Sequence, residues 1–178
     1  MATTNQKSEV AFKDVTKVAH SKNIHTVILK DCSFNVDAGK LTVLIGPSGC
    51  GKTTVINLIA GYERPDRGEV LMDGHPVSEP NWERLVMFQE MALFPWLTCY
   101  ENVMFGPIAR SSLSREEAHR EALMLLNKVG LGDFIDKYPS QLSGGMQRRA
   151  ELARALINKP KVMLMDEPFR GLDAMTES

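Results

Sequence analysis

The stretch that decides the fold is Gly46-Pro47-Ser48-Gly49-Cys50-Gly51-Lys52-Thr53. It matches the phosphate-loop pattern G-x-x-x-x-G-K-[ST] at every defined position. Glycines let backbone N–H groups close around a polyphosphate, the lysine supplies a positive charge, and the terminal hydroxyl can reach a magnesium ion. The stretch therefore predicts a loop that binds the phosphates of a nucleoside triphosphate.

The residues on either side of the loop supply the context that it requires. Leu41–Ile45 is a short apolar run that predicts a strand ending at the loop. From Thr53 to Ala60 the apolar residues follow a helical period, and Gly61 marks the end of that helix. Strand, loop and helix in this order is the arrangement of a phosphate-binding unit.

The rest of the first half of the chain also indicates strands. Apolar and polar residues alternate around 10–12 and again around 34–36, which predicts two half-buried strands. Turn signals bracket a further short strand at 69–72. Another apolar run, 85–88, predicts a strand that ends at Gln89.

The character of the sequence changes after this point. A capping box at 114–117 opens an amphipathic helix, and a second helix is expected from about 144 to 158, before Pro160. Val162–Met165 is continuously apolar and is followed by acids, the pattern of a strand buried on both faces with carboxylates at its C-terminal end.

These patterns predict one domain with an internal division. The α/β nucleotide-binding core is expected to comprise residues 9–89 and 159–178, and the segment 90–158 is expected to form a helical subdomain within the single domain 1–178.

Composition excludes several classes of protein. The 178 residues contain 21 basic and 22 acidic side chains, so nothing indicates binding to nucleic acid or to an anionic membrane surface. No apolar run approaches the roughly 20 residues that span a bilayer, and the N-terminus does not read as a secretory signal. We therefore expect any membrane association to come through a partner.

The three cysteines show no paired or metal-ligand spacing, which suits a reducing compartment. Cys50 lies inside the phosphate loop, beside Lys52 and at the start of a helix. A positive environment of this kind favours a reactive thiol. We expect alkylation of Cys50 to block nucleotide binding and bound nucleotide to protect it.

A second motif narrows the interpretation. Leu142-Ser143-Gly144-Gly145-Met146-Gln147 precedes a helix and then the run that ends in Asp166-Glu167-Pro168. Together with the phosphate loop, these motifs resemble the ATP-binding subunit of ABC transporters from about residue 9 to the end of the chain. The run 94–98, continued by Glu101-Asn102-Val103, resembles the subfamily that imports nitrate, sulfonates and taurine.

The resemblance implies a fold and a reaction. The expected fold is α/β, a P-loop NTPase (RecA-like) core with N-terminal antiparallel β strands and an inserted helical subdomain. The implied activity is ATP hydrolysis coupled to transmembrane transport, with ATP and Mg²⁺ as cofactors.

The resemblance also assigns roles to individual residues. The nucleotide-binding residues would be Gly46, Pro47, Ser48, Gly49, Cys50, Gly51, Lys52, Thr53 and Thr54 of the phosphate loop and Ser143, Gly144, Gly145 and Gln147 of the signature motif. Magnesium would be held by Thr53, Gln89 and Asp166. Glu167 would be the general base for the attacking water, which Gln89 would also contact.

Partners follow from the same resemblance. The signature motif would contact the ATP held by a second ATP-binding subunit, so a head-to-tail dimer is expected. The dimer would act on membrane permease subunits, and indirectly on a substrate-binding protein, from the cytoplasmic face of the cell membrane. The apolar run 91–98 is either core packing or an exposed patch for docking to such a partner.

The chain departs from the family in two places. Residues 15–20 lack the aromatic side chain that stacks on adenine, and His20 either replaces it or is an ordinary surface residue. The family continues past the acid pair through a strand and a histidine that contacts the γ-phosphate, whereas the four histidines here all precede Glu167. The chain therefore looks C-terminally truncated, and we expect negligible ATP hydrolysis by the 178-residue chain.

Two other functions stay open from the sequence. One is a nucleotide-binding subunit that does not hydrolyse ATP, and the other is a soluble ABC ATPase without a transporter.

Overall fold

The computed structural model describes residues 9–21 and 24–167. These residues form two compact units. The first comprises 9–86 with 161–166, and the second comprises 87–160 with Glu167. Among the described residues, no helix is both long and apolar enough to cross a bilayer.

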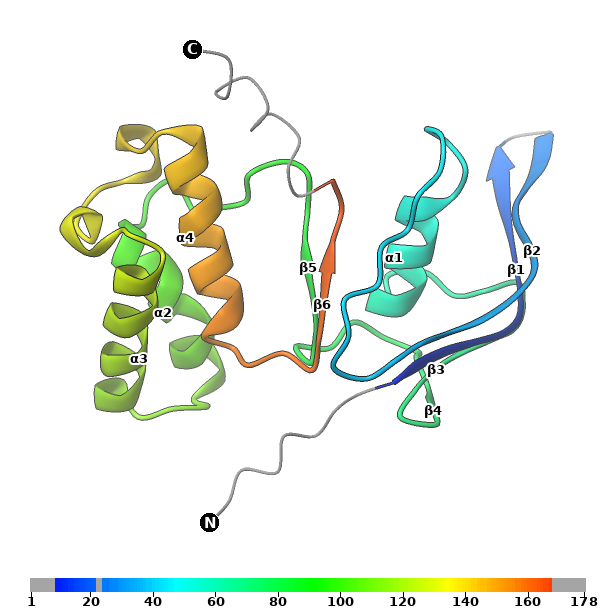
Figure 1. Cartoon of the computed structure of the whole chain (residues 1–178), viewed down its shortest axis with the longest axis horizontal. Helices are drawn as coiled ribbons and strands as arrows, with labels where there is room; N and C mark the ends of the chain where they lie inside the picture. Colours follow the sequence, from blue (N-terminus) through cyan, green and yellow to red (C-terminus); the bar gives the residue numbers. More distant parts are fainter. Residues whose placement is uncertain (1–8, 22–23, 168–178) are drawn as a thin grey trace. The chain divides into compact units, whose positions relative to one another are not determined.

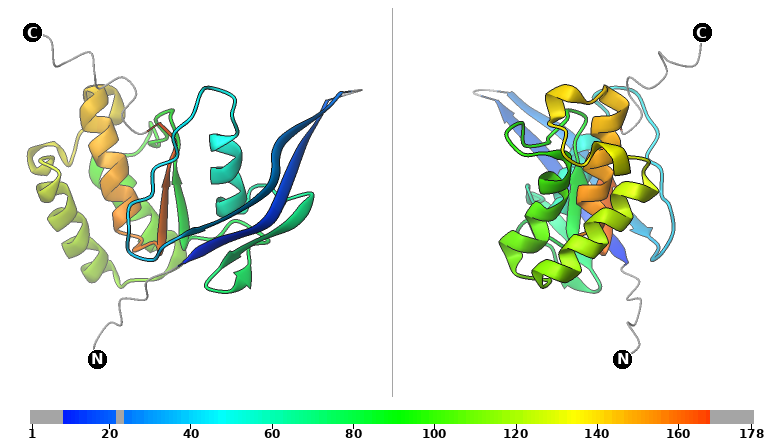
Figure 2. Two further views of the ribbon diagram at one scale, coloured as in Figure 1. Left: turned by 45° about the vertical axis from the view of Figure 1, so that its right-hand side comes forward. Right: turned by 90° about the vertical axis from the view of Figure 1, so that its left-hand side faces the viewer.

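An antiparallel four-stranded sheet forms one side of the first unit. Its spatial order is β2-β1-β3-β4, and the strands are β1 (Val10–Ser21), β2 (Ile24–Val36), β3 (Arg67–Met72) and β4 (His75–Pro76). β1 and β2 run side by side along their length (Figures 1 and 2). Phe12 pairs with Phe34, and their rings stack with centroids 4.3 Å apart. The alternating pattern thus predicted the N-terminal strands correctly.

The helix after the phosphate loop is α1 (Lys52–Ala60), and it packs on this sheet. It ends at Gly61, whose φ of 84° is the left-handed conformation of a glycine cap. Its inward face contributes Val55, Ile56, Leu58 and Ile59 to the apolar core of the unit. The predicted helix and its stop signal are confirmed.

A second, two-stranded sheet joins β5 (Arg84–Met87) and β6 (Val162–Met165). Both strands were expected from their apolar runs. The prediction that 162–165 is buried on both faces is wrong, because only Leu164 is buried and Met165 is 38% exposed. Within the described residues β6 pairs with β5 alone, so its other edge has no strand to cover it.

The expected strand at Leu41–Ile45 does not form. These residues are irregular and exposed, with Leu41 at 91% and Ile45 at 93%. A strand needs neighbours that pair with its backbone and cover its apolar side chains. None of the described strands pairs with this run, so its apolar composition is not sufficient to make it a strand.

The second unit is helical. It contains α2 (Cys99–Arg110), α3 (Arg115–Lys128) and α4 (Gly144–Leu156), with 3₁₀ turns at Gly132–Phe134 and Pro139–Gln141. The two views of Figure 2 show the three helices side by side. Their core contains Cys99, Val103, Ala122, Leu126, Leu131, Ala150, Ala153 and Ile157.

The helix starts follow capping chemistry. The expected box at Ser114 and Glu117 is present in α3, and a second one, Thr98 with Glu101, opens α2. The helix expected over about 144–158 is observed as α4, which ends at Leu156, before Pro160 can interrupt it.

Candidate nucleotide-binding site

The phosphate loop requires its glycines for space and for backbone conformation. Gly49 and Gly51 have φ values of 81° and 97°, which side-chain-bearing residues rarely adopt. A Cβ on Gly46 would lie 2.6 Å from the Cys50 Sγ. In Figure 1 the loop arches over the N-terminal end of α1, where free backbone N–H groups favour an anion.

The ammonium group of Lys52 lies inside this loop. Its Nζ donates to the carbonyl oxygens of Gly46 at 2.8 Å and Pro47 at 2.9 Å. The loop therefore curls around a fixed positive charge. This combination of backbone donors and one cation suits the oxygens of a polyphosphate.

Two site residues that are far apart in the sequence meet here. Thr53 Oγ1 donates to Asp166 Oδ2 at 2.9 Å, across 113 residues. Thr53 lies in the first turn of α1, and Asp166 directly follows β6. A hydroxyl and a carboxylate at one place supply the hard oxygen ligands that Mg²⁺ prefers, so the residues present fit this ion.

Glu167, the expected general base, is exposed and has a φ of 45°. This left-handed conformation is unfavourable for glutamate by about 1–3 kcal/mol, and such strained residues gather at functional sites. Glu167 directly follows Asp166 in the chain, and Asp166 is the residue that accepts a hydrogen bond from Thr53.

The signature motif lies in the helical unit. Ser143 caps α4, its hydroxyl accepting from the backbone N–H of Met146 at 3.3 Å. Ser143 and Gly144 are exposed. Gln147 is not exposed, and its amide donates to the carbonyls of Pro139 at 2.9 Å and Leu142 at 3.1 Å, which braces the turn before the motif.

Gln89 is exposed in the segment that follows β5 and belongs to the helical unit, as do Ser143, Gly144, Gly145 and Gln147. The structure thus brings Thr53 and Asp166 together in the first unit, which also contains the phosphate-loop residues 46–54. It groups Gln89, Ser143, Gly144, Gly145 and Gln147 in the helical unit.

His20, the alternative partner for adenine, is paired within the strand hairpin. Its Nδ1 lies 2.8 Å from the Nδ1 of His25, and its Nε2 lies 3.8 Å from a carboxylate oxygen of Asp66. Its side chain is 62% exposed. Stacking on a base stays a prediction.

Comparisons with known proteins agree with this geometry. A family described as "ABC transporter" matches residues 29–170. The chain belongs to the ABC transporter family. Its fold is accordingly the P-loop NTPase fold of ABC cassettes, as expected from the motifs.

Curated relatives include the taurine import ATP-binding protein TauB of Roseobacter denitrificans, 46% identical over 152 residues, and that of Ruegeria pomeroyi, 48% identical over 149 residues. The alignments cover 85% and 83% of this chain but only 56% and 55% of the relatives. The chain therefore spans a little over half the length of these relatives.

Solved structures of ABC cassettes are also similar to this chain. A bacterial ABC transporter cassette solved as a dimer is 34% identical, with a TM-score of 0.81 over 93% of this chain and 76% of that one. A dimeric cassette in a post-hydrolysis state with bound ADP and Pi is also 34% identical, with a TM-score of 0.78 over 90% and 75% of the two chains.

In this ABC cassette, the sequence did not predict which side chains hold residues 88–98, the segment that follows β5. Asn102, fully buried in α2, accepts from Phe94 N and donates to the carbonyls of Phe94, Leu97 and Thr98 at 3.0–3.1 Å. Glu151 of α4 is also buried. A polar residue on the inward face of a helical pattern was the available signal for both.

The cassette's cysteines differ sharply in exposure, which yields a labelling prediction. Cys50 is exposed in the phosphate loop, whereas Cys99 is fully buried and burial raises its pKa to about 11. At pH 8 only about 1 in 1,000 Cys99 thiols would be ionised. We expect iodoacetamide to modify Cys50 in the folded protein and Cys99 only after denaturation, as read by peptide mass spectrometry.

Saturating Mg-ATP should slow the labelling of Cys50 and leave that of Cys32, which lies on β2, unchanged. Equal rates at Cys50 with and without nucleotide would contradict the placement of ATP at this loop.

Proposed function

We propose that this chain is the ATP-binding part of a subunit that hydrolyses ATP to power an ABC importer. The observation that carries this proposal is the joint placement of Lys52 inside its loop and of Asp166 on Thr53. One arrangement offers a cation and backbone donors for phosphate, and hydroxyl and carboxylate oxygens for a metal. ATP with Mg²⁺ requires this pair of features.

The roles of the residues are those that the family resemblance implies, supported for Lys52, Thr53 and Asp166 by their contacts. Residues 46–54 would hold the phosphates, and Mg²⁺ bound by Thr53, Asp166 and Gln89 would supply charge neutralisation at the phosphate oxygens. Glu167 would accept the proton of the attacking water. Residues 9–89 and 159–178 would form the nucleotide-binding core and 90–158 the helical subdomain, boundaries that differ slightly from those of the two compact units, which assign Gln89 to the helical one. Residues 168–178 lie outside the described residues.

Two copies would act together as a head-to-tail dimer. Ser143, Gly144 and Gly145 form an exposed or half-exposed helix start, which can offer backbone donors to the γ-phosphate on a second copy. Support comes from the two related cassettes, both solved as dimers.

The helical unit offers a surface for a permease. Trp96 is 70% exposed, and Met91 and Phe105 are each nearly half exposed. Phe94 contacts the rings of both Trp96 and Phe105, so these three aromatic side chains form an apolar patch. A groove of about 840 Å³ lies between α2 and the start of α3 in the same unit. Binding of a permease to the apolar patch or to this groove would place the protein at the cytoplasmic face of the membrane.

The transported substrate would be a small anion such as taurine, another sulfonate or nitrate. The curated relatives are named for taurine import. The run 94–98 that resembles this subfamily contributes Phe94 and Trp96 to the apolar patch.

The test is nucleotide binding by the purified chain, and phosphate release by a subunit of the full length of the curated relatives, since we expect negligible hydrolysis by the 178 residues alone. We expect saturable ATP binding that weakens when EDTA removes Mg²⁺, and phosphate release that depends on both. Absence of ATP binding would overturn the proposal. Binding without phosphate release would instead assign the non-hydrolysing function.

A further inference from the structure

The segment that carries Gln89 is attached along one face of α4. Arg148 Nη1 donates to the Phe88 carbonyl at 2.7 Å, at the start of the segment. A carboxylate oxygen of Glu151 accepts from the backbone N–H of Ala92. The guanidinium of Arg154 lies 5.3 Å from the centroid of the Phe94 ring, a cation–π contact.

The three α4 residues act as one unit, which we name the α4 clamp: Arg148, Glu151 and Arg154. They are spaced three residues apart, so they lie on the same side of the helix. A second oxygen of Glu151 accepts from Arg148 at 2.8 Å. Both carboxylate oxygens of this buried side chain are therefore satisfied, one by the segment and one by the helix.

Burial gives the clamp its strength. The side chains of Arg148 and Glu151 are 14% and 6% exposed. Burial lowers the pKa of Arg154, and the nearby charge of Glu151 opposes that shift. Hydrogen bonds to a buried charge are stronger than those on a wetted surface, and losing one partner leaves the other charge uncompensated.

The clamp also links the segment to the signature motif. α4 begins directly after Ser143, and a Cβ on Gly144 would lie 3.3 Å from the Met91 Cε. Gln89 thus sits between Phe88, which Arg148 holds, and Met91, which packs on the signature glycine.

We propose that the α4 clamp positions Gln89 relative to the signature motif, so that the two move as one body. Arg148 and Glu151 are positioning residues in this proposal, because they touch the backbone that carries Gln89 and not the nucleotide. The proposal rests on the proposed function, in which Gln89 contacts Mg²⁺ and water and the signature motif contacts ATP on a second copy. A shift of the signature helix on closure would then carry Gln89 with it.

The first arm of the test measures the clamp without nucleotide. Hydrogen–deuterium exchange of residues 89–94 is compared among wild type, Glu151→Ala, Glu151→Gln and Arg148→Ala. We expect exchange in this segment about tenfold faster in the two alanine variants, the effect of losing one hydrogen bond of ordinary strength. Glu151→Gln keeps an acceptor for Ala92 N and should restore most of the protection.

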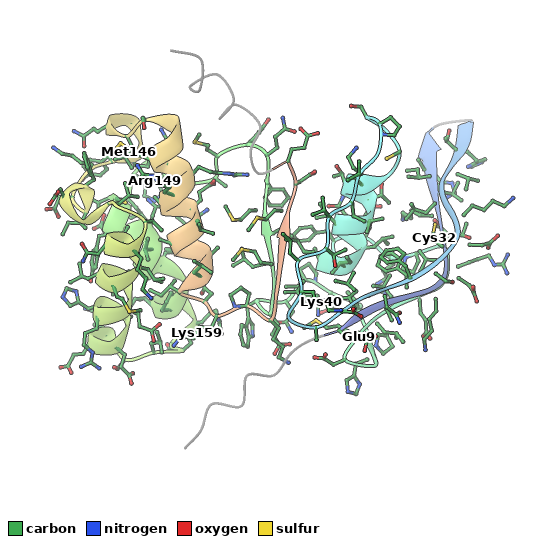
Figure 3. All side chains as sticks on the ribbon, viewed as in Figure 1. Glu9, Cys32, Lys40, Met146, Arg149 and Lys159 are labelled. Carbon is green, nitrogen blue, oxygen red and sulfur yellow. The ribbon has the colours of Figure 1, made fainter. Side chains whose placement is uncertain are left out.

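Arg149→Ala is the matched control. Arg149, labelled on α4 in Figure 3, neighbours Arg148 in the chain, but its Nη1 donates to the Val129 carbonyl at 2.7 Å. Its removal should leave exchange at 89–94 unchanged. Should Glu151→Ala fail to fold, Arg148→Ala and Glu151→Gln carry the comparison. Wild-type exchange at 89–94 in Arg148→Ala would overturn the clamp.

The second arm measures steady-state ATP hydrolysis with the same substitutions in a full-length subunit. Displacement of a catalytic group by about 1 Å can cost on the order of 100-fold in rate. We expect Arg148→Ala to lower kcat about tenfold, with the KM for ATP within about twofold of the wild-type value. Glu151→Gln should keep most of the wild-type kcat. Faster exchange with unchanged kcat would overturn the positioning role. Lys52→Ala, measured in the same assay, distinguishes failure of the positioning role from failure of the proposed function. Unchanged hydrolysis in Lys52→Ala would overturn the proposed function itself.

Discussion

In a full-length subunit, replacing Glu167 with Gln is expected to abolish ATP turnover while ATP binding persists. The amide keeps the size of the side chain but cannot accept the proton of the attacking water. A general base contributes about 100- to 10,000-fold, so we expect kcat to fall by at least about 100-fold. Phosphate release gives the rate, titration with a fluorescent ATP analogue gives the affinity, and size-exclusion chromatography should show the ATP-bound dimer accumulating.

Glu69→Gln is the matched control for this variant. Glu69 is an exposed glutamate on β3 that pairs with Lys13 at 3.6 Å, so its change removes the same charge outside the site. Turnover in Glu69→Gln should equal that of wild type. If Glu167→Gln hydrolyses ATP at a rate near wild type, Glu167 is not the base.

Lys52→Ala is expected to weaken ATP binding by about 10- to 100-fold. A hydrogen bond between charged groups contributes about 1.5–3 kcal/mol, and each 1.4 kcal/mol is tenfold in affinity. In the structure the Lys52 ammonium is held at the centre of the loop by Gly46 and Pro47, where phosphate oxygens would meet it. Titration with the same fluorescent analogue measures the loss.

Lys40→Ala tests whether the loss of any nearby cation has this effect. Lys40, labelled in Figure 3, precedes the loop and donates to Asp37, and this hydrogen bond raises the pKa of Lys40. It therefore carries the same charge without facing the loop carbonyls. Equal affinities in Lys52→Ala and Lys40→Ala would refute the assignment of Lys52.

Sequence patterns predicted helices and helix caps correctly where the contacts that form them join residues close together in the sequence. The helix from Lys52 to Ala60 and its stop at Gly61 follow from period and cap alone. The capping box of Ser114 with Glu117 likewise closes within one helical turn. These contacts span three or four residues, so their spacing in the sequence specifies them.

Strands were harder, because a strand depends on what pairs with it. The alternation around Phe12 and Phe34 succeeded because the two strands pair with each other. The apolar run Leu41–Ile45 has the same intrinsic preference but no partner among the described strands, and it is not a strand. Apolar composition at 162–165 similarly predicted more burial than one neighbouring strand supplies.

By itself, the sequence determined the phosphate-loop motif, the end of α1 at Gly61, the capping box of α3 and the membership of the family, because each depends on residue types at fixed short spacings. It did not predict α2. Only the tertiary structure decided that Thr53 donates to Asp166 across 113 residues and that Glu151 holds the segment carrying Gln89. Such contacts depend on the path of the whole chain. A hydrogen bond between distant residues forms only where packing brings both groups to about 3 Å, and no local pattern encodes that distance.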